Sequence, residues 1–140
     1  MSTVEHKSQD RSAELLEQVQ QALATKTPLR LQGGNTKSFL GKAVQGQELS
    51  LAGHEGVVDY DPAELVVTVR AGTSLQALET VLNEQGQCLP FEPPLFDGQA
   101  TVGGATACGL SGPRRPHAGA ARGSARFRQS AVVALDRLQT

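Results

Sequence analysis

The sequence predicts a mixed fold of the α/β or α+β class, and three observations support this prediction. Two segments carry apolar residues at helical spacing, short β-branched segments alternate with them, and Gly and Pro separate the two kinds of segment. The chain has 140 residues, about the size of one small domain. The predicted order is helix, strand, loop, three strands, helix and strand, and we find no internal repeat.

The first predicted helix covers residues 10–25. Pro28 follows and prevents the helix from continuing. Glutamate and glutamine cover most of the predicted surface, and one apolar stripe remains for packing against the rest of the fold. The stripe consists of Leu15, Leu16, Val19, Ala22 and Leu23.

The most strongly predicted strand is 64–70, because Val and Thr favour a pleated surface. Leu65, Val67 and Val69 fall on one face, and Val66 and Thr68 on the other suit a sheet covered on both sides. Weaker strand candidates are 29–31, 48–51, 56–60 and 87–90.

The second predicted helix begins after Thr73, where Thr73 and Gln76 have the spacing of a capping box with Thr73 at the cap. Gly86 can adopt the left-handed turn that often ends a helix. The apolar stripe of this helix consists of Leu75, Leu78, Val81 and Leu82.

A glycine pair ends the first predicted strand, at Gly33 and Gly34. Two glycines allow a sharp turn and a close approach to a ligand, and successive N–H groups in such a turn form an anion site. Asn35, Thr36 and Lys37 add donors and a positive charge. The segment matches neither GxxxxGK[ST] nor GxGxxG. Alternatively, it is an ordinary turn between strand and loop.

A second run of small residues covers 100–112. Such a run either lies flush against a flat ligand or packs tightly within the protein. A short helix beginning near Gly103 would direct N–H groups and a helix dipole at a phosphate. The alternative is a flexible Gly- and Ala-rich segment.

Together these segments resemble the FAD-binding PCMH-type domain of the vanillyl-alcohol oxidase superfamily. The resemblance rests on LRLQGGNTKS (29–38), DPAELVVTVRAGT (61–73), EPP (92–94) and ATVGG (100–104). The run GLSGPRRP (109–116) is also similar to the FAD-binding E subunits of bacterial glycolate oxidases. The resemblance therefore implies an α+β domain made of two subdomains with FAD between them.

The resemblance also implies site residues and partners. It places the FAD diphosphate against the first loop and the cofactor's diphosphate and flavin side against the second. The partners would be the other glycolate oxidase subunits, a second flavin subunit and an iron–sulfur subunit. No histidine matches a covalent flavin link, and no catalytic residue is identified. The expected cofactor-binding residues are Gly33, Gly34, Asn35, Thr36, Lys37, Thr101, Val102, Gly103, Gly104, Gly109, Leu110, Ser111 and Gly112.

Composition and charge exclude several other classes of protein. The net charge is −1, which gives no electrostatic footprint for nucleic acid. Cys88 and Cys108 have no metal-ligand spacing and are expected to be reduced thiols, so we expect no metal. No segment is apolar enough to span a membrane, and no signal peptide is present. A cytoplasmic location is the default, with attachment to the inner membrane through partner subunits as an option.

The resemblance ends near Arg126, where related chains continue into a second FAD subdomain. We therefore divide the chain into a flexible N-terminus (1–11), a partial FAD-binding domain (12–126) whose second subdomain is truncated, and a divergent C-terminal tail (127–140). A reading-frame shift or a genuine short homologue would both explain this. We expect the chain alone to bind FAD weakly or not at all. The alternative function is a non-catalytic interaction module without flavin, or a product with no stable role.

Overall fold

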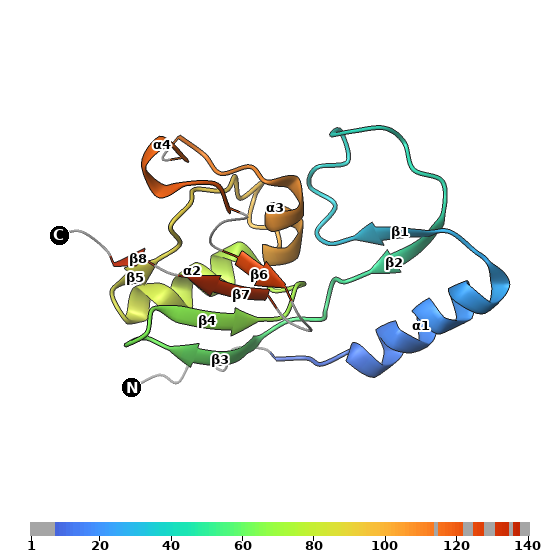
Figure 1. The fold of residues 1–140 in the computed structure, drawn as a ribbon, viewed down its shortest axis with the longest axis horizontal. Coiled ribbons are helices and arrows are strands. Elements are labelled where there is room, and N and C mark those ends of the chain that lie inside the picture. Colours follow the sequence, from blue (N-terminus) through green and yellow to red (C-terminus); the bar gives the residue numbers. More distant parts are fainter. Residues whose placement is uncertain (1–7, 114, 122–124, 128–130, 135, 138–140) are drawn as a thin grey trace.

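The computed structural model describes residues 8–113, 115–121, 125–127, 131–134 and 136–137 (Figure 1). The part of the predicted flexible N-terminus that covers 1–7 lies outside the described residues. The helices and strands follow one another in this order: α1 (Ser12–Thr25), β1 (Leu29–Gln32), β2 (Gln47–Ser50), β3 (Val57–Asp61), β4 (Val66–Val69), α2 (Leu75–Glu84), β5 (Gln87–Cys88), α3 (Val102–Cys108), α4 (Arg115–Ala118), β6 (Ala125–Phe127), β7 (Ala131–Ala134) and β8 (Asp136–Arg137).

The main sheet is antiparallel and has the strand order β3-β4-β7-β6. Its central strand β4 buries Val67 and Val69 completely, as the predicted alternation requires. Helix α2 packs its stripe into the same core, where Leu75, Leu78 and Leu82 are fully buried. Burial of side chains of this size, about 1.5–3 kcal/mol each, fixes the sheet against α2.

The start of α2 differs from the prediction by one residue. Ser74, not Thr73, is the N-cap, and its hydroxyl oxygen accepts a hydrogen bond from the N–H of Ala77. Thr73 is buried instead, and its Oγ1 accepts from the N–H of Gly56 at 2.9 Å. The capping-box prediction was wrong because Thr73 satisfies a buried amide of the neighbouring turn, which leaves the next hydroxyl to cap the helix. Gly86 is left-handed at φ 65°, as predicted.

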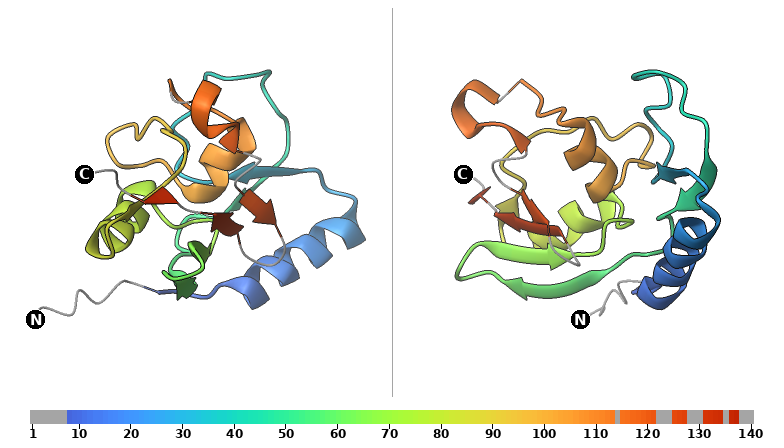
Figure 2. Two further views of the ribbon diagram at one scale, coloured as in Figure 1. Left: turned by 60° about the vertical axis from the view of Figure 1, so that its left-hand side comes forward. Right: turned by 45° about the vertical axis from the view of Figure 1, so that its right-hand side comes forward.

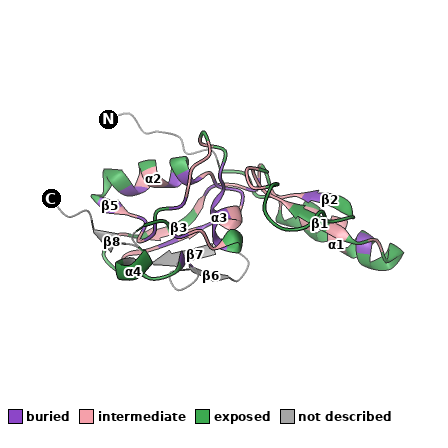
Figure 3. Cartoon of the chain, turned by 90° about the horizontal axis from the view of Figure 1, so that it is seen from above, coloured by how far each residue is buried: buried purple, intermediate pink, exposed green. Residues whose placement is uncertain are grey.

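Helix α1 and the parallel pair of β1 and β2 lie to one side of the main sheet (Figures 1 and 3). The predicted helix is confirmed, but its apolar stripe is not buried: only Ala22 is buried, whereas Leu16 is 57% and Leu23 is 72% exposed. Helical periodicity predicts which side chains share a face, not whether a partner covers that face.

Residues beyond 126 add strands to the fold. Strand β7 pairs antiparallel with β4, with Val66 opposite Ala134 and Val69 opposite Ala131. Strand β8 pairs with β5. These pairings place part of the predicted divergent tail in two sheets. Within the described ranges, no helix has both the length and the apolar character needed to cross a membrane.

Candidate cofactor site

The loop that joins β1 to β2 lies beside α3 in the fold (Figures 1 and 2). Residues of this loop and of one side of α3 line a cleft of about 470 Å³. The two predicted glycine-containing segments meet here, although they are far apart in the sequence. The segment 33–37 contributes one wall, and Thr101 and Gly104 contribute to the other. The two segments therefore face a common cleft.

Gly33 and Gly34 allow the two walls to come into direct contact. A Cβ on Gly34 would stand 1.8 Å from the backbone oxygen of Gln99, and a Cβ on Gly33 would stand 2.6 Å from Oγ1 of Thr101. Any other residue would push the two loops apart. The glycine pair is thus required by contact between the two loops, whereas the sequence suggested a close approach to a ligand.

The residue that follows the glycine pair takes the unusual backbone conformation. Asn35 is left-handed at φ 55°, which Asn tolerates better than most residues. Among the described residues, none accepts a hydrogen bond from the N–H groups of Gly33, Gly34 or Asn35. Within the part of the chain that the structure describes, these three successive N–H groups have no acceptor, and they can donate to a ligand at this wall.

The other wall is one side of α3. Thr101, Gly104, Ala107 and Cys108 line the cleft, at the three- and four-residue spacing that defines one helix face. All four residues are small. A ligand can therefore lie close to the helix along its length.

The amides at the start of α3 are already used within the protein. The N–H of Val102 donates to the backbone oxygen of Thr73, and that of Gly103 donates to the oxygen of Ala71, both at 2.9 Å. The N–H of Gly104 donates to Oγ1 of Thr101 at 3.2 Å. The first turn of α3 thus has few free donors for a phosphate, contrary to the expectation from sequence.

The charge lining the cleft is positive. Arg30, Lys37 and Lys42 line it, and no aspartate or glutamate is among the lining residues that the structure describes. Arg30 forms an ion pair with Glu48 at 3.1 Å. Lys37 donates to the neutral Oγ1 of Thr36 at 3.3 Å. This balance favours an anionic ligand.

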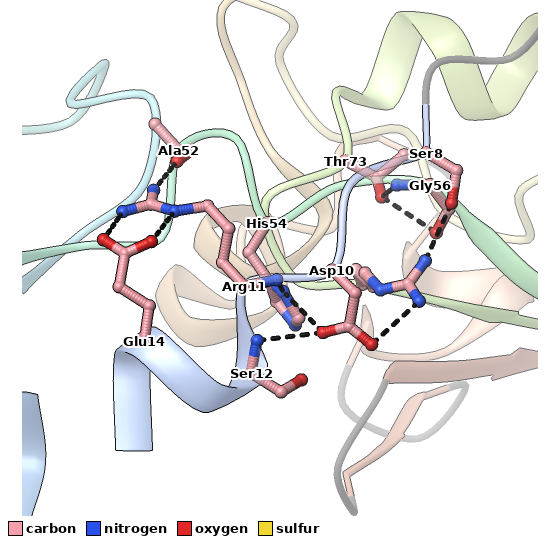
Figure 4. A network of polar contacts seen from close by, with 10 residues as sticks. Ser8, Asp10, Arg11, Ser12, Glu14, Ala52, His54, Gly56 and Thr73 are labelled. Atoms are coloured by element: carbon pink, nitrogen blue, oxygen red, sulfur yellow. Dashed lines mark hydrogen bonds and ion pairs between the residues drawn. The ribbon is translucent and has the colours of Figure 1, made fainter. Parts of the chain in front are cut away.

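A polar network joins the start of α1 to the turns before β3 and α2 (Figure 4). The N–H of Arg11 donates to Nδ1 of buried His54 at 3.1 Å, and the N–H of Gly72 donates to the His54 carbonyl at 2.9 Å. Asp10 accepts from Arg70 at 3.2 Å. Burial lowers the pKa of His54 from its usual value, so the neutral form that accepts this hydrogen bond is favoured.

The same network perturbs Asp10. Hydrogen bonds from Ser12 and then from Arg70 lower the pKa of Asp10 to about 2. Gly72 lies between Ala71 and Thr73, whose backbone oxygens accept hydrogen bonds from the first amides of α3. The network therefore anchors both α1 and the α3 wall of the cleft to the same turns. The network helps to position the walls of the cleft, but its residues do not line the cleft.

Seven of the thirteen residues expected at the cofactor line the cleft, and six do not. Val102 is 1% exposed and belongs to the core, and Gly103 packs against Ala71. Ser111 accepts from the N–H of Ala121, and Gly112 packs against Glu92. Gly109 ends α3, and Leu110 follows it outside the cleft. The expected residues that do line the cleft are Gly33, Gly34, Asn35, Thr36, Lys37, Thr101 and Gly104.

Sequence reasoning missed several lining residues. Ala107 and Cys108 could have been found by extending the helical spacing from Thr101 along the run of small residues. Leu40, Lys42 and Val44 carry no motif, because they reach the cleft through the path of the β1–β2 loop. Arg30 and Leu31 lie on β1 within the run 29–38, but that run did not single them out as site residues.

Comparison with known proteins gives three findings. The family described as "FAD binding domain" matches residues 10–127. Subunit GlcE of glycolate oxidase from Escherichia coli (strain K12) is 55% identical over 113 residues, which are 81% of this chain and 32% of that protein. The chain thus spans about a third of the length of this relative.

Two solved structures of alkyldihydroxyacetonephosphate synthase, in crystal forms P1 and P212121, have a similar fold. Their TM-scores are 0.71 and 0.72 at 19% and 18% identity. Each match covers 90% of this chain and 32% or 30% of the synthase. At such identity the likeness concerns the fold alone, and it confirms the predicted α+β class. This chain covers only part of the matched FAD-binding domain.

Proposed function

Because the chain belongs to the FAD binding domain family, we propose that the cleft between the β1–β2 loop and α3 binds the diphosphate of FAD. Membership confirms the resemblance found in the sequence, and the family and the glycolate oxidase relative indicate FAD as the cofactor.

The single observation that carries this proposal is the meeting of the two loops at one cleft, and the chemistry of the cleft fits the ligand. The free N–H groups of residues 33–35 can donate to phosphate oxygens. Lys37 and Lys42 supply positive charge, and the small side chains of α3 leave room for an extended ligand. A volume of about 470 Å³ lies within the range of small-molecule pockets.

The chain contributes binding and orientation in this proposal. Bound FAD supplies the redox chemistry through its isoalloxazine ring. The loop 33–37 fixes the diphosphate, and α3 orients the rest of the cofactor along its face. The proposal assigns no catalytic residue to this chain.

We extend the proposal to the assembly that the relative suggests. The chain would be the FAD-binding subunit, or a part of it, in an oxidoreductase complex that acts on glycolate or a similar 2-hydroxy acid. The partners would be a second flavin subunit and an iron–sulfur subunit, and the location the cytoplasm, at the inner membrane through those partners. The support is 55% identity to a glycolate oxidase subunit.

One observation favours a second candidate, an interaction module that carries no flavin. Leu16 and Leu23 on α1 are exposed, and large exposed apolar side chains are common at interfaces. The two candidates differ in ligand binding. An interaction module would bind partner subunits without any response to FAD.

Binding of FAD and ADP to variants of the cleft tests the proposal. In the double variant Lys37→Met/Lys42→Met, affinity should fall at least about tenfold, because charge-assisted hydrogen bonds contribute roughly 1.5–3 kcal/mol each. Lys26→Met, which removes a charge at the end of α1, should leave affinity unchanged. An equal loss in Lys26→Met, or no loss in the double variant, would contradict the proposed site.

A further inference from the structure

The aromatic ring of Phe96 lies beneath the ammonium group of Lys37. Nζ of Lys37 is 5.1 Å from the ring centroid, within the range of a cation–π interaction. A second ring, that of Phe39, lies 6.2 Å from Phe96 at an interplanar angle of 59°. Lys37 lines the cleft, whereas Phe96 does not.

Phe96 is held in place by an unusual turn. Phe96, Asp97 and Gly98 are all left-handed, with φ values of 45°, 55° and 77°. The N–H groups of Gly98 and Ala100 both donate to the oxygen of Leu95, at 3.1 and 3.2 Å. A bulky residue at positive φ persists only where its surroundings determine it. The partly buried Phe96 packs against the core.

This turn also leads directly to the contact between the two loops. Gln99, whose backbone oxygen touches Gly34, follows it by one residue. The same short segment therefore fixes the glycine pair through backbone contact and Lys37 through a ring. Both effects act on the wall that carries the three free N–H groups.

We propose that Phe96 is a positioning residue, whose ring holds the Lys37 ammonium at the cleft for the diphosphate of FAD. A free lysine side chain loses conformational entropy when it binds an anion. A ring beneath the ammonium restricts the lysine side chain before the ligand binds, so less conformational entropy is lost on binding. The ring accepts no hydrogen bond from the ammonium, so the N–H groups of Lys37 remain available to the phosphate. This inference rests on the proposed function of the cleft.

The first test needs no ligand. In the NMR spectrum of the 140-residue chain, the ring current of Phe96 should shift the ε-methylene protons of Lys37 upfield. The shift should vanish in Phe96→Leu and persist in Phe96→Tyr. The corresponding protons of Lys42 serve as the internal control. Unshifted Lys37 protons in the unsubstituted chain would overturn the inference, whatever the chain binds.

The second test is a double-mutant cycle with ADP and FAD as probes and adenosine as the phosphate-free control. Phe96→Leu should weaken ADP and FAD binding about two- to fivefold, as expected for a cation–π contact at a partly exposed site. It should leave adenosine binding unchanged. In the Lys37→Met background, Phe96→Leu should have no further effect. Phe96→Tyr should retain wild-type affinity.

The outcomes separate the inference from the proposed function. If Lys37→Met weakens ADP binding but Phe96→Leu acts equally in both backgrounds, the role of Phe96 is structural and only the inference fails. The proposed cleft requires at least weak binding by the chain alone, so if an NMR titration of the unsubstituted chain detects binding of neither ADP nor FAD, the proposed function fails and the inference fails with it. Equal thermal unfolding of Phe96→Leu and Phe96→Tyr excludes loss of fold as the cause.

Discussion

The hydroxyl oxygen of Thr101 lies 2.6 Å from the position that a Cβ on Gly33 would occupy. Thr101 is also the N-cap of α3 and lines the cleft. One side chain therefore joins the start of a helix, the end of β1 and the candidate cofactor site. The two loops hold each other in place before any ligand arrives, and this is the form of preorganisation that lowers the cost of binding.

Substitution of Gly34 should separate the loops. In Gly34→Ala, the new methyl group would meet the backbone oxygen of Gln99, and we expect a loss of about 3 kcal/mol in the free energy of unfolding. Gly41→Ala is the matched control in the same loop, because its φ is 80° with open space around it, and should lose only about 1 kcal/mol. Chemical denaturation measures both. Equal losses would show that the contact between the loops is unimportant.

Removal of the hydroxyl groups of Thr73 and Ser74, just before α2, should lower the folding stability by different amounts. Thr73→Val leaves the buried N–H of Gly56 without its acceptor and should cost roughly 1–3 kcal/mol of folding stability. Ser74→Ala removes the cap of α2 and should cost about 1 kcal/mol. Thr73→Ser and Ser74→Asp keep the respective hydrogen bonds and should be close to wild type in thermal unfolding. A wild-type stability for Thr73→Val would contradict this assignment.

Folding stability should fall as the pH decreases through the range of His54. Burial lowers the pKa of His54 below its usual 6.5. The unfolded chain therefore binds a proton more readily than the folded one, and stability is full above about pH 6.5 and declines below it. Protonation at Nδ1 also breaks the hydrogen bond from Arg11.

Thermal unfolding between pH 7.5 and 5.5, a range of about one unit on either side of the histidine pKa, checks this. His54→Gln should flatten the decline, and His117→Gln, at an exposed position on α4, should leave it intact. A decline that persists in His54→Gln would assign the pH dependence to other groups.

A negative charge on the cleft face of α3 should repel the proposed ligand. Cys108 is exposed and lines the cleft. Cys108→Glu should lower the affinity for ADP about five- to tenfold through like-charge repulsion, with little change in unfolding temperature. Cys108→Ser keeps the size and neutrality of the side chain and should bind as wild type. Unchanged affinity in Cys108→Glu would place the phosphates elsewhere.

Local patterns in the sequence predicted most elements. The alternation of Val67 and Val69, the spacing of Leu75, Leu78 and Leu82, and the turn at Gly86 each depend on a few neighbouring residues. These features are confirmed by the structure. The N-cap of α2 was missed because its neighbour Thr73 bonds to Gly56, a contact between residues distant in sequence.

The candidate site was only half visible in the sequence. The glycine pair and Thr101 were identifiable, because small residues in two loops indicate close backbone approach. Phe96 and Lys42 were not, since their places depend on how the loops cross in three dimensions. The burial of Val102 and the packing of Gly103 against Ala71 likewise depend on tertiary contacts.

The most direct test is an NMR titration of the ¹⁵N-labelled chain with FAD and with ADP, which detects weak binding as well as strong. We predict that the amide signals of Gly33, Gly34 and Asn35 shift together with those of Gly104 and Cys108, at one common affinity. Riboflavin, which lacks the diphosphate, should leave the three loop amides unchanged. Shifts confined to one wall, or centred on residues away from both, would contradict a shared diphosphate site.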